Sequence, residues 1–311
     1  MAEHILEVKN LHTSFHTDAG VVQAVRGVSF YVEKGESLGI VGESGCGKSV
    51  SMLSIMRLLE DNASLEADSL TFDGQDLLHI SGKDMRAIQG NRIGMIFQDP
   101  MACLNPRKKV IDIIAEGLDV QHRCATSQER SGKVAEILKR VGLAPEHALR
   151  YPHQFSGGQR QRIGIARALI MEPKLIIADE CISALDVSIQ AQVVNLIKDI
   201  QKETGTAYLF IAHDLSMVKY ISDRIGVMHL GHLLETGTTE EIFSNPIHPY
   251  TKSLLSAIPH PNPRTERNRK VTYYDYKTAG VDYTKGTLHL AGGSHCVLAT
   301  DQEFLEWTKS M

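Results

Sequence analysis

The spacing of apolar residues near the start of the chain predicts three strands and a helix. From Ile5 to Val8, and again from Val28 to Val32, apolar and polar residues roughly alternate, as they do in half-buried strands. The run Leu38–Val41 is short and largely apolar, and it leads directly into a glycine-rich loop. Beyond that loop, apolar residues recur at helical spacing, at Val50, Leu53, Ile55, Met56, Leu58 and Leu59.

The middle of the chain changes to a helical pattern and then returns to strands. Between about Arg107 and Glu146 the spacing predicts a helical lobe inserted into an α/β core. The apolar positions of that lobe are Val110, Ile111, Ile113, Ile114, Leu118, Val134, Ile137, Leu138 and Val141. Leu175–Ala178 and Tyr208–Ala212 are typical of buried parallel strands, and Ile189–Ile200 predicts a crossover helix between them.

Three closely spaced prolines, Pro259, Pro261 and Pro263, predict a boundary before a more polar tail. We therefore divide the chain into a domain at 1–258 and an accessory segment at 259–311. A chain of 311 residues is long enough to bury a large core and to carry a second lobe.

Composition narrows the class of protein. With 33 basic and 37 acidic residues the net charge is −4, which argues against a nucleic-acid-binding protein that relies on a general positive field. No apolar run approaches the roughly 18–20 residues of a membrane-spanning helix, and the first residues do not resemble a signal peptide. The five cysteines are scattered, so neither a disulfide framework nor a zinc site is indicated. We expect a cytosolic protein that reaches a membrane only through a partner.

The glycine-rich loop matches the phosphate-binding pattern G-x-x-x-x-G-K-[ST] in full. Its residues are Gly42, Glu43, Ser44, Gly45, Cys46, Gly47, Lys48 and Ser49. Glycines let backbone N–H groups converge on phosphate oxygens, and the helix that follows adds its positive N-terminal end. Lys48 would contact the β- and γ-phosphates, and the Ser49 hydroxyl would bind Mg²⁺. The alternative, a chance glycine-rich turn, is disfavoured by the flanking strand and helix.

Two carboxylates, Asp179 and Glu180, end the apolar strand that begins at Leu175. The carboxyl ends of parallel strands are where such sheets bind ligands. Asp179 suits the Mg²⁺ shell, directly or through water, and Glu180 suits polarising the attacking water, as a base or as an orienting group. In isolation the pair would be an ordinary acidic strand end, but the glycine loop favours the functional interpretation.

A second helix start suited to anions is predicted at Ser156, Gly157, Gly158 and Gln159. These residues precede an apolar helical face at Ile163, Ile165, Ala166, Leu169 and Ile170. One nucleotide cannot easily use both this helix start and the glycine loop. A head-to-tail dimer with two ATP molecules between the subunits is an economical solution, although a Gly-Gly turn before a helix would show the same residues.

Two further residues are candidates by position. His213 follows the strand Tyr208–Ala212 and could contact the γ-phosphate, although an isolated histidine is more often a surface or core residue. Phe15 is a candidate for stacking on adenine, and a core or surface aromatic is an equally good interpretation of it.

The order of these motifs resembles the ATP-binding cassette (ABC) transporter ATPases over residues 1 to about 258. The resemblance implies an α/β fold with a P-loop NTPase core, an N-terminal antiparallel β subdomain and a helical subdomain at about 100–165. It implies that Ser156–Gln159 completes an ATP site whose glycine loop belongs to a second ATPase subunit. Gln98 matches the family's glutamine loop, which links Mg²⁺ and water to the helical subdomain. Ser183–Asp186 resembles the loop between the two ATPase subunits, which makes Asp186 a nucleotide-site candidate. The alternative for Gln98 is a solvated loop glutamine, and the alternative for Ser183–Asp186 is a helix-capping turn.

Two segments narrow the resemblance to the oligopeptide/dipeptide permease ATPases. Arg150–Gln154 precedes the Ser-Gly-Gly-Gln segment, and Asn245–Thr251 lies near the end of the cassette. Such ATPases belong to bacterial importers with two membrane permease subunits, two ATPases and an external peptide-binding protein. From about Leu104 onward the chain resembles the F-type subunit, whereas Ser49–Met101 is closer to the D-type sister.

The chain departs from this family in two places. Cys181 stands where the family usually has proline; proline is not a ligand, so hydrolysis should survive the change. Many relatives carry a cysteine-rich tail proposed to hold an iron–sulfur cluster. Here Cys296 is the only cysteine beyond Cys181, so we expect no cluster, and Gly293–Val297 looks like the cysteine-poor tail of Gram-positive versions.

The resemblance therefore implies an ATPase that uses ATP and Mg²⁺ to power peptide uptake from the cytoplasmic face of a bacterial membrane. An ATPase for another solute such as nickel is an alternative. A soluble ABC ATPase acting on DNA or ribosomes is a second one, but it usually has a coiled-coil insertion or two cassettes. An inactive regulatory module is a third, against which the intact set of Lys48, Asp179, Glu180 and His213 argues. Whether the second ATPase is a sister chain or another copy is left open.

Overall fold

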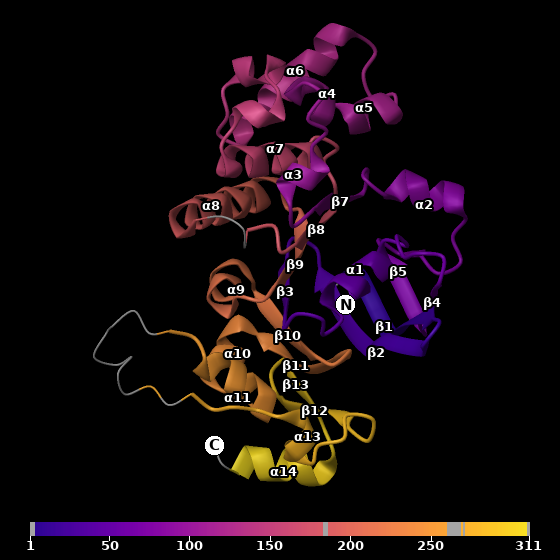
Figure 1. Ribbon diagram of the computed structural model, residues 1–311, viewed down its shortest axis with the longest axis vertical. Coiled ribbons are helices and arrows are strands. Elements are labelled where there is room, and N and C mark those ends of the chain that lie inside the picture. The colour runs from indigo at the N-terminus through magenta and orange to yellow at the C-terminus, as the bar shows by residue number, and fades with distance from the viewer. Residues whose placement is uncertain (1–3, 183–185, 260–268, 270, 310–311) are drawn as a thin grey trace. The chain divides into compact units, whose positions relative to one another are not determined.

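The computed structural model describes residues 4–182, 186–259, 269 and 271–309. Figure 1 shows its helices and strands. The chain divides into two compact units. The first unit is Met1–Leu6, Val32–Glu36 and Thr71–Phe210, and the second is Glu7–Tyr31, Ser37–Leu70 and Ile211–Met311. The second unit therefore holds both the glycine loop and the described C-terminal residues.

The first unit combines buried strands with a group of helices. Strands β7 (Ile93–Ile96) and β8 (Leu175–Asp179) are parallel, and β8 is followed in the sheet order by β9 (Ala207–Ala212). Leu175, Ile176, Ile177 and Ala178 are all fully buried, as expected for a strand covered on both faces. Between β8 and β9 the chain forms α8 (Val187–Thr204), the predicted crossover helix.

The predicted helical segment is present between β7 and β8, and Figure 1 shows α4 to α7 grouped together. Its elements are α3 (Pro100–Cys103), α4 (Val110–Ile114), α5 (Glu116–Val120), α6 (Ser127–Arg140), η1 (Pro145–Leu149), η2 (Pro152–Gln154) and α7 (Gly157–Leu169). Earlier in this unit lie the end of β5 (Ser69–Phe72), β6 (Gln75–Asp76) and α2 (Gly82–Ile88). The side chains of Val134, Ile137 and Leu138 on α6 are buried, as the helical spacing predicts.

The second unit is built on two sets of strands. Long strands β1 (His4–Thr17) and β2 (Gly20–Glu33) begin or end in the first unit, and β4 (Ala63–Glu66) pairs antiparallel with β1. The other set runs in the order β12 (Thr287–Gly292), β13 (His295–Ala299), β11 (His232–Thr238), β10 (Arg224–His229) and β3 (Ser37–Val41). Only the β10–β3 pair in this set is parallel. Its helices are α1 (Lys48–Ile55), α9 (Leu215–Ile221), α10 (Thr239–Ser244), α11 (Pro249–Ser256), α13 (Tyr276–Ala279) and α14 (Asp301–Lys309).

Two details differ from the sequence-based expectations. The helix after the glycine loop ends at Ile55 because Arg57 adopts a left-handed conformation with φ of 50°. Leu58 consequently lies beyond the helix and is 46% exposed. The sequence analysis also assigned no strand to the polar tail, whereas β12 and β13 lie there and extend the β10–β11 sheet. The boundary at 258/259 stays a prediction, because Pro261 and Pro263 lie outside the described residues.

Candidate nucleotide site

The phosphate loop connects β3 to α1 in the second unit, and two of its glycines have no substitute. Gly47 has φ of 104° at the N-cap of α1, and Gly42 has φ of 155°. A Cβ on Gly42 would collide with the carbonyl oxygen of Met228, and one on Gly47 with that of Ala24. Both positions therefore need glycine for conformation and for space.

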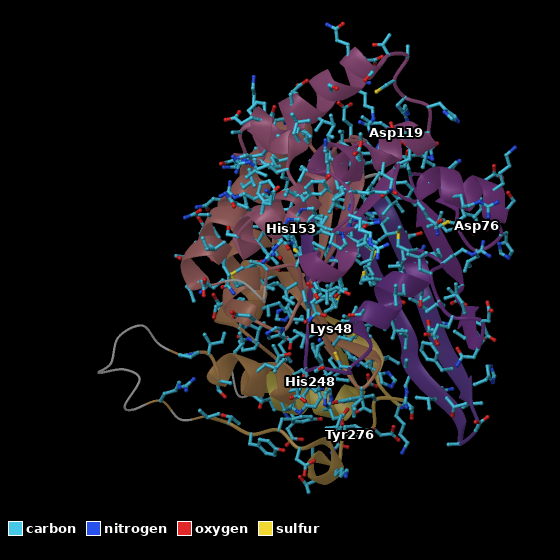
Figure 2. All side chains as sticks on the ribbon, turned by 45° about the horizontal axis from the view of Figure 1, so that its top comes forward. Lys48, Asp76, Asp119, His153, His248 and Tyr276 are labelled. Carbon is cyan, nitrogen blue, oxygen red and sulfur yellow. The ribbon has the colours of Figure 1, made fainter. Side chains whose placement is uncertain are left out.

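Lys48 is turned back over the loop that precedes it. Its Nζ donates hydrogen bonds to the carbonyl oxygens of Gly42 at 2.7 Å and Glu43 at 2.8 Å, and the residue is only 4% exposed. Figure 2 labels Lys48 among the side chains of the chain. A buried cation must keep hydrogen-bonded partners, so these carbonyls hold Lys48 at a point where a phosphate oxygen could also bind it.

Cys46 contributes no charge to the loop. Burial raises the pKa of its thiol, although the nearby ammonium of Lys48 acts in the opposite direction. The neutral thiol lies 3.8 Å from Lys48 Nζ. Cys46 is thus a small buried residue in this loop, which agrees with its place at a variable position of the motif. Ser49, in the first turn of α1, is half-buried.

The carboxylates lie in the first unit, where the structure joins Glu180 to Gln98. Gln98 Nε2 donates a hydrogen bond to Glu180 Oε2 at 2.7 Å. The two residues follow β7 and β8, and because these strands are parallel neighbours their carboxyl ends lie at the same edge. The contact spans 82 positions in the sequence.

Glu180 is also held in an unusual backbone conformation. Its φ of 42° lies in the left-handed region, which costs a non-glycine residue about 1–3 kcal/mol and is often found at functional sites. The preceding Asp179 is the last residue of β8 and is half-buried. Burial raises the pKa of the next residue, Cys181, to about 12, so its thiol is neutral and is a poor metal ligand.

The Ser-Gly-Gly-Gln segment begins α7 with a reciprocal cap. Ser156 Oγ accepts a hydrogen bond from the Gln159 N–H, and Gln159 Oε1 accepts one from the Ser156 N–H at 3.0 Å. A Cβ at Gly158 would approach Ile189 Cγ2 to 2.6 Å. The cap accounts structurally for Ser156 and Gln159 and begins a helix of 13 residues.

The remaining candidates lie on separate elements. His213 is an exposed residue of the second unit, just before Asp214, whose side chain caps α9. Phe15 is half-buried on β1, where it pairs with Ala63 of β4. Asp186 is exposed at the N-cap of α8, and Ser183, Ala184 and Leu185 lie outside the described residues.

Sequence analysis missed one residue that supports the phosphate loop. The N–H of Glu43 donates a hydrogen bond to the Tyr250 hydroxyl at 3.2 Å, across 207 positions. Tyr250 belongs to the Asn245–Thr251 segment that carried part of the family resemblance. The motif could have drawn attention to Tyr250, but nothing in it indicates that Tyr250 contacts the phosphate loop.

A strand, a glycine loop that holds its lysine and a following helix define a P-loop nucleotide-binding protein. Comparison with known proteins specifies the class. The model of the family "ABC transporter" matches residues 25–183, and that of "Oligopeptide/dipeptide transporter, C-terminal region" matches residues 234–279. This chain belongs to the ABC transporter family and has the ABC ATPase fold.

Curated relatives match along nearly the whole chain. The oligopeptide transport ATP-binding protein OppF of Bacillus subtilis (strain 168) is 55% identical, over 98% of this chain and 99% of the relative. The dipeptide transport ATP-binding protein DppF of Lactococcus lactis subsp. cremoris (strain MG1363) is 50% identical, over 96% and 95%.

Solved structures match the fold. The structure of cbiO1 from Clostridium perfringens, part of the ABC transporter complex cbiONQ, aligns with a TM-score of 0.70 at 26% identity, over 86% of this chain and 98% of that one. The dimeric bacterial ABC transporter cassette MJ0796 aligns with a TM-score of 0.68 at 26% identity, over 75% and 98%. A second structure of MJ0796 is described as a post-hydrolysis state bound to ADP and Pi. Within the described residues of our chain, no helix has the length and apolar character needed to cross a membrane.

Proposed function

We propose that this chain hydrolyses ATP to energise the uptake of oligopeptides or dipeptides by a bacterial ABC importer. The hydrogen bond between Gln98 and the strained Glu180 is the observation that carries the hydrolytic role. The peptide substrate is supported by the near full-length similarity to OppF and DppF, whose names state oligopeptide and dipeptide transport.

Each site residue has a role in this proposal. Lys48 keeps its hydrogen bond to the Gly42 carbonyl and exchanges the one to Glu43 for β- and γ-phosphate oxygens, so its charge remains paired throughout. Glu180 polarises the attacking water, and Gln98 orients Glu180. His213 contacts the γ-phosphate, and Phe15 stacks on adenine.

Mg²⁺ fits the donor chemistry of this chain. It prefers oxygen ligands, and the Ser49 hydroxyl, the Asp179 carboxylate and the Gln98 side-chain carbonyl are of that kind. When bound, the ion neutralises charge on the transferred phosphoryl group. We assign these three residues to its coordination shell.

A second ATPase subunit completes each site in this proposal. Ser156–Gln159 of one subunit would face the nucleotide on the phosphate loop of the other, with Asp186 at the same interface. The dimeric structure of MJ0796 supports this arrangement. Two membrane permease subunits hold the pair at the cytoplasmic face of the cell membrane, and an external binding protein delivers the peptide.

The substitution Glu180→Gln tests the hydrolytic role in the transporter purified with its co-purifying subunits. We expect turnover to fall by at least about 100-fold, the lower range for loss of a general base. ATP binding should persist, so the ATP-bound complex should accumulate. Glu136→Gln, on the exposed surface of α6, is the matched control. Unchanged steady-state hydrolysis in Glu180→Gln would exclude Glu180 from the reaction.

The same preparation tests the substrate. We expect the co-purifying subunits to include membrane permeases, and ATPase activity in liposomes to rise with the binding protein and peptide. Activation by Ni²⁺ with a nickel-binding protein, and none by peptides, would instead support the alternative solute. Mass spectrometry of the complex distinguishes a sister ATPase from a second copy of this chain.

A further inference from the structure

The peptide bond between Gly42 and Glu43 is held from both sides. Its carbonyl oxygen, on Gly42, accepts the hydrogen bond from Lys48 Nζ at 2.7 Å. Its N–H, on Glu43, donates to the Tyr250 hydroxyl at 3.2 Å. A trans peptide is planar, with C=O and N–H pointing in opposite directions. Fixing the N–H with Tyr250 therefore fixes the direction of the carbonyl that holds Lys48.

This peptide needs an external anchor because a glycine precedes it. Gly42 rotates more easily than any other residue, and its φ of 155° is uncommon for L-residues. Tyr250 is only 1% exposed and therefore makes the bond away from water. Among the described residues, the Tyr250 hydroxyl is the acceptor for the Glu43 N–H.

Tyr250 is in turn held by an aromatic cluster of the second unit, which we name the tyrosine–histidine cluster. Its members are His229, Tyr250, Tyr274, Tyr276 and Tyr283. The rings of Tyr250 and His229 stack with centroids 4.1 Å apart. His229 Nδ1 lies 2.8 Å from the Tyr283 hydroxyl, which lies 3.1 Å from that of Tyr274. Burial lowers the pKa of His229, so its ring is neutral near pH 7.

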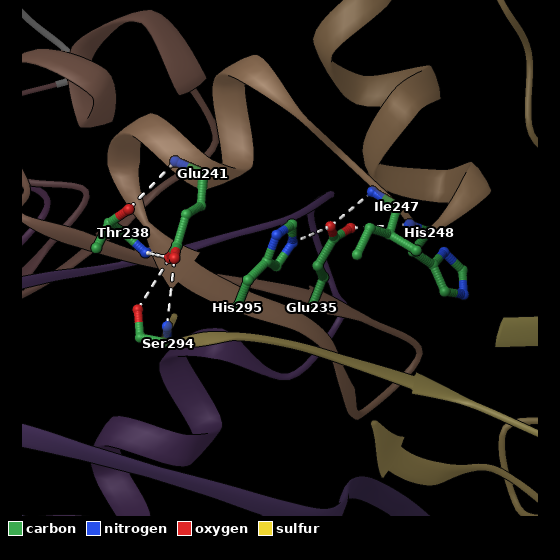
Figure 3. Close-up of polar contacts among 7 residues, drawn as sticks. All are labelled: Glu235, Thr238, Glu241, Ile247, His248, Ser294 and His295. Atoms are coloured by element: carbon green, nitrogen blue, oxygen red, sulfur yellow. Dashed lines mark hydrogen bonds and ion pairs between the residues drawn. The ribbon is translucent and has the colours of Figure 1, made fainter. Parts of the chain in front are cut away.

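The helix that carries Tyr250 is fixed by a buried carboxylate, shown in Figure 3. Glu235 on β11 accepts hydrogen bonds from the N–H groups of Ile247 at 2.7 Å and His248 at 3.0 Å. The same carboxylate lies 2.7 Å from Nε2 of His295 on β13. His248 then caps α11, because its Nδ1 accepts a hydrogen bond from the Tyr250 N–H.

We propose that Tyr250 is a positioning residue for the phosphate loop, and that Tyr283 of the C-terminal segment acts on ATP binding through it. The inference rests on the proposed function only in assigning Lys48 to the phosphates of ATP. It makes the C-terminal segment part of the machinery that orients Lys48, although no residue of that segment needs to touch the nucleotide.

The substitution Tyr250→Phe removes the hydroxyl and keeps the stacked ring. We expect the Kd for ATP of the purified complex to rise about threefold to tenfold, the usual range for one hydrogen bond. The KM for ATP should rise with it, while kcat changes less than twofold. Tyr208→Phe is the matched control, because Tyr208 is fully buried in the first unit and its hydroxyl has no hydrogen-bond partner among the described residues. Equal thermal stability of the two variants would show that a general loss of folding is not the cause.

A double-mutant cycle tests the second half of the inference. Tyr283→Phe removes the hydrogen bond to His229 and should raise the Kd for ATP by less than Tyr250→Phe does. If Tyr283 acts through Tyr250, the double variant should match Tyr250→Phe alone. Full additivity would overturn the role of Tyr283, because the two hydroxyls would then act independently.

The outcomes separate this inference from the proposed function. An unchanged Kd in Tyr250→Phe, with hydrolysis lost in Glu180→Gln, overturns the positioning role and leaves the ATPase assignment intact. Normal hydrolysis in Glu180→Gln with a raised Kd in Tyr250→Phe contradicts the catalytic assignment alone. A raised Kd in both Tyr250→Phe and Tyr208→Phe would mean that loss of any buried hydroxyl weakens binding, and it too overturns the positioning role.

Discussion

The phosphate loop and the carboxylate strand end are stabilised in opposite ways. In the second unit, buried Lys48 donates two hydrogen bonds to carbonyl oxygens of its own loop, and the Tyr250 hydroxyl accepts one from the N–H of Glu43 in that loop. In the first unit, Glu180 is half-buried in a strained conformation, and Gln98 reaches it from a neighbouring strand. The proposed binding residues are thus held by hydrogen bonds within their loop, whereas the carboxylate that we propose as catalytic belongs to a residue with a strained backbone. The comparison predicts that substitutions in the phosphate loop weaken ATP binding, whereas substitutions at the carboxylate strand end slow hydrolysis.

The largest effect should come from Lys48→Ala. We expect the Kd for ATP to rise by at least about 100-fold, equivalent to about 2.8 kcal/mol, because charge-assisted bonds to the phosphates are lost. Equilibrium binding of a fluorescent ATP analogue measures the effect. Lys139→Ala, at an exposed position of α6, is the control. If Lys48→Ala bound ATP normally and lost only turnover, the contrast between a binding loop and a catalytic strand end would fail.

A smaller effect, on turnover, should follow Gln98→Ala. Without the bond to Gln98 the carboxylate of Glu180 loses its orientation, and we expect kcat to fall about 10-fold to 100-fold. The Kd for ATP measured without Mg²⁺ should change less than twofold, since the phosphate loop is unaltered. Steady-state kinetics at saturating Mg²⁺ measures kcat, and equilibrium binding of a fluorescent ATP analogue without Mg²⁺ measures the Kd. Gln128→Ala, on the exposed surface of α6, is the control. A raised Kd with normal kcat would place Gln98 among the binding residues.

The phosphate loop was the most predictable part of the site because its geometry is local. Lys48 bonds to the carbonyls of Gly42 and Glu43 in the same loop, so the motif contains both partners. The carbonyls of Ala24 and Met228, which leave no room for a Cβ at Gly47 and Gly42, come from β2 and β10 and are not part of the motif. The end of α1 was less predictable. Leu58 continues the helical spacing, but the left-handed conformation of Arg57 stops the helix first.

The C-terminal contacts could not be read from the sequence because they join distant positions. His295 meets Glu235 across 60 residues, and nothing in the pattern around either residue indicates the other. The strand β12 that accompanies them carries exposed Leu288 and Leu290, so its hydrophobic pattern does not indicate a buried face. Asp179 and Glu180 were predictable as a strand end, whereas the left-handed φ of Glu180 was not.

The last prediction concerns the pH dependence of folding stability rather than ATP binding or turnover, and it again separates the two regions. Burial lowers the pKa of His248 to about 3, and burial together with nearby Arg26 lowers that of His232 to about 4. In the unfolded chain both would titrate near the model-peptide value of about 6.5. The unfolded state therefore binds more protons below that pH, so stability is fully present above about pH 6.5 and falls as pH decreases toward 4. Each histidine should contribute up to about 1.4 kcal/mol of lost stability per pH unit in that range.

The substitution His248→Asn isolates one of these histidines. Asparagine is a good N-cap and can accept the Tyr250 N–H in place of His248 Nδ1, but it does not titrate. We expect the variant to lose less stability than the parent chain between pH 6.5 and 5, as measured by chemical denaturation. His153→Asn, at an exposed position of the first unit, should leave the pH dependence unchanged. If stability depended on pH equally in His248→Asn and the parent chain, His248 would be protonated to the same extent in the folded and unfolded states. The cap of α11, the helix that carries Tyr250, would then be insensitive to acid.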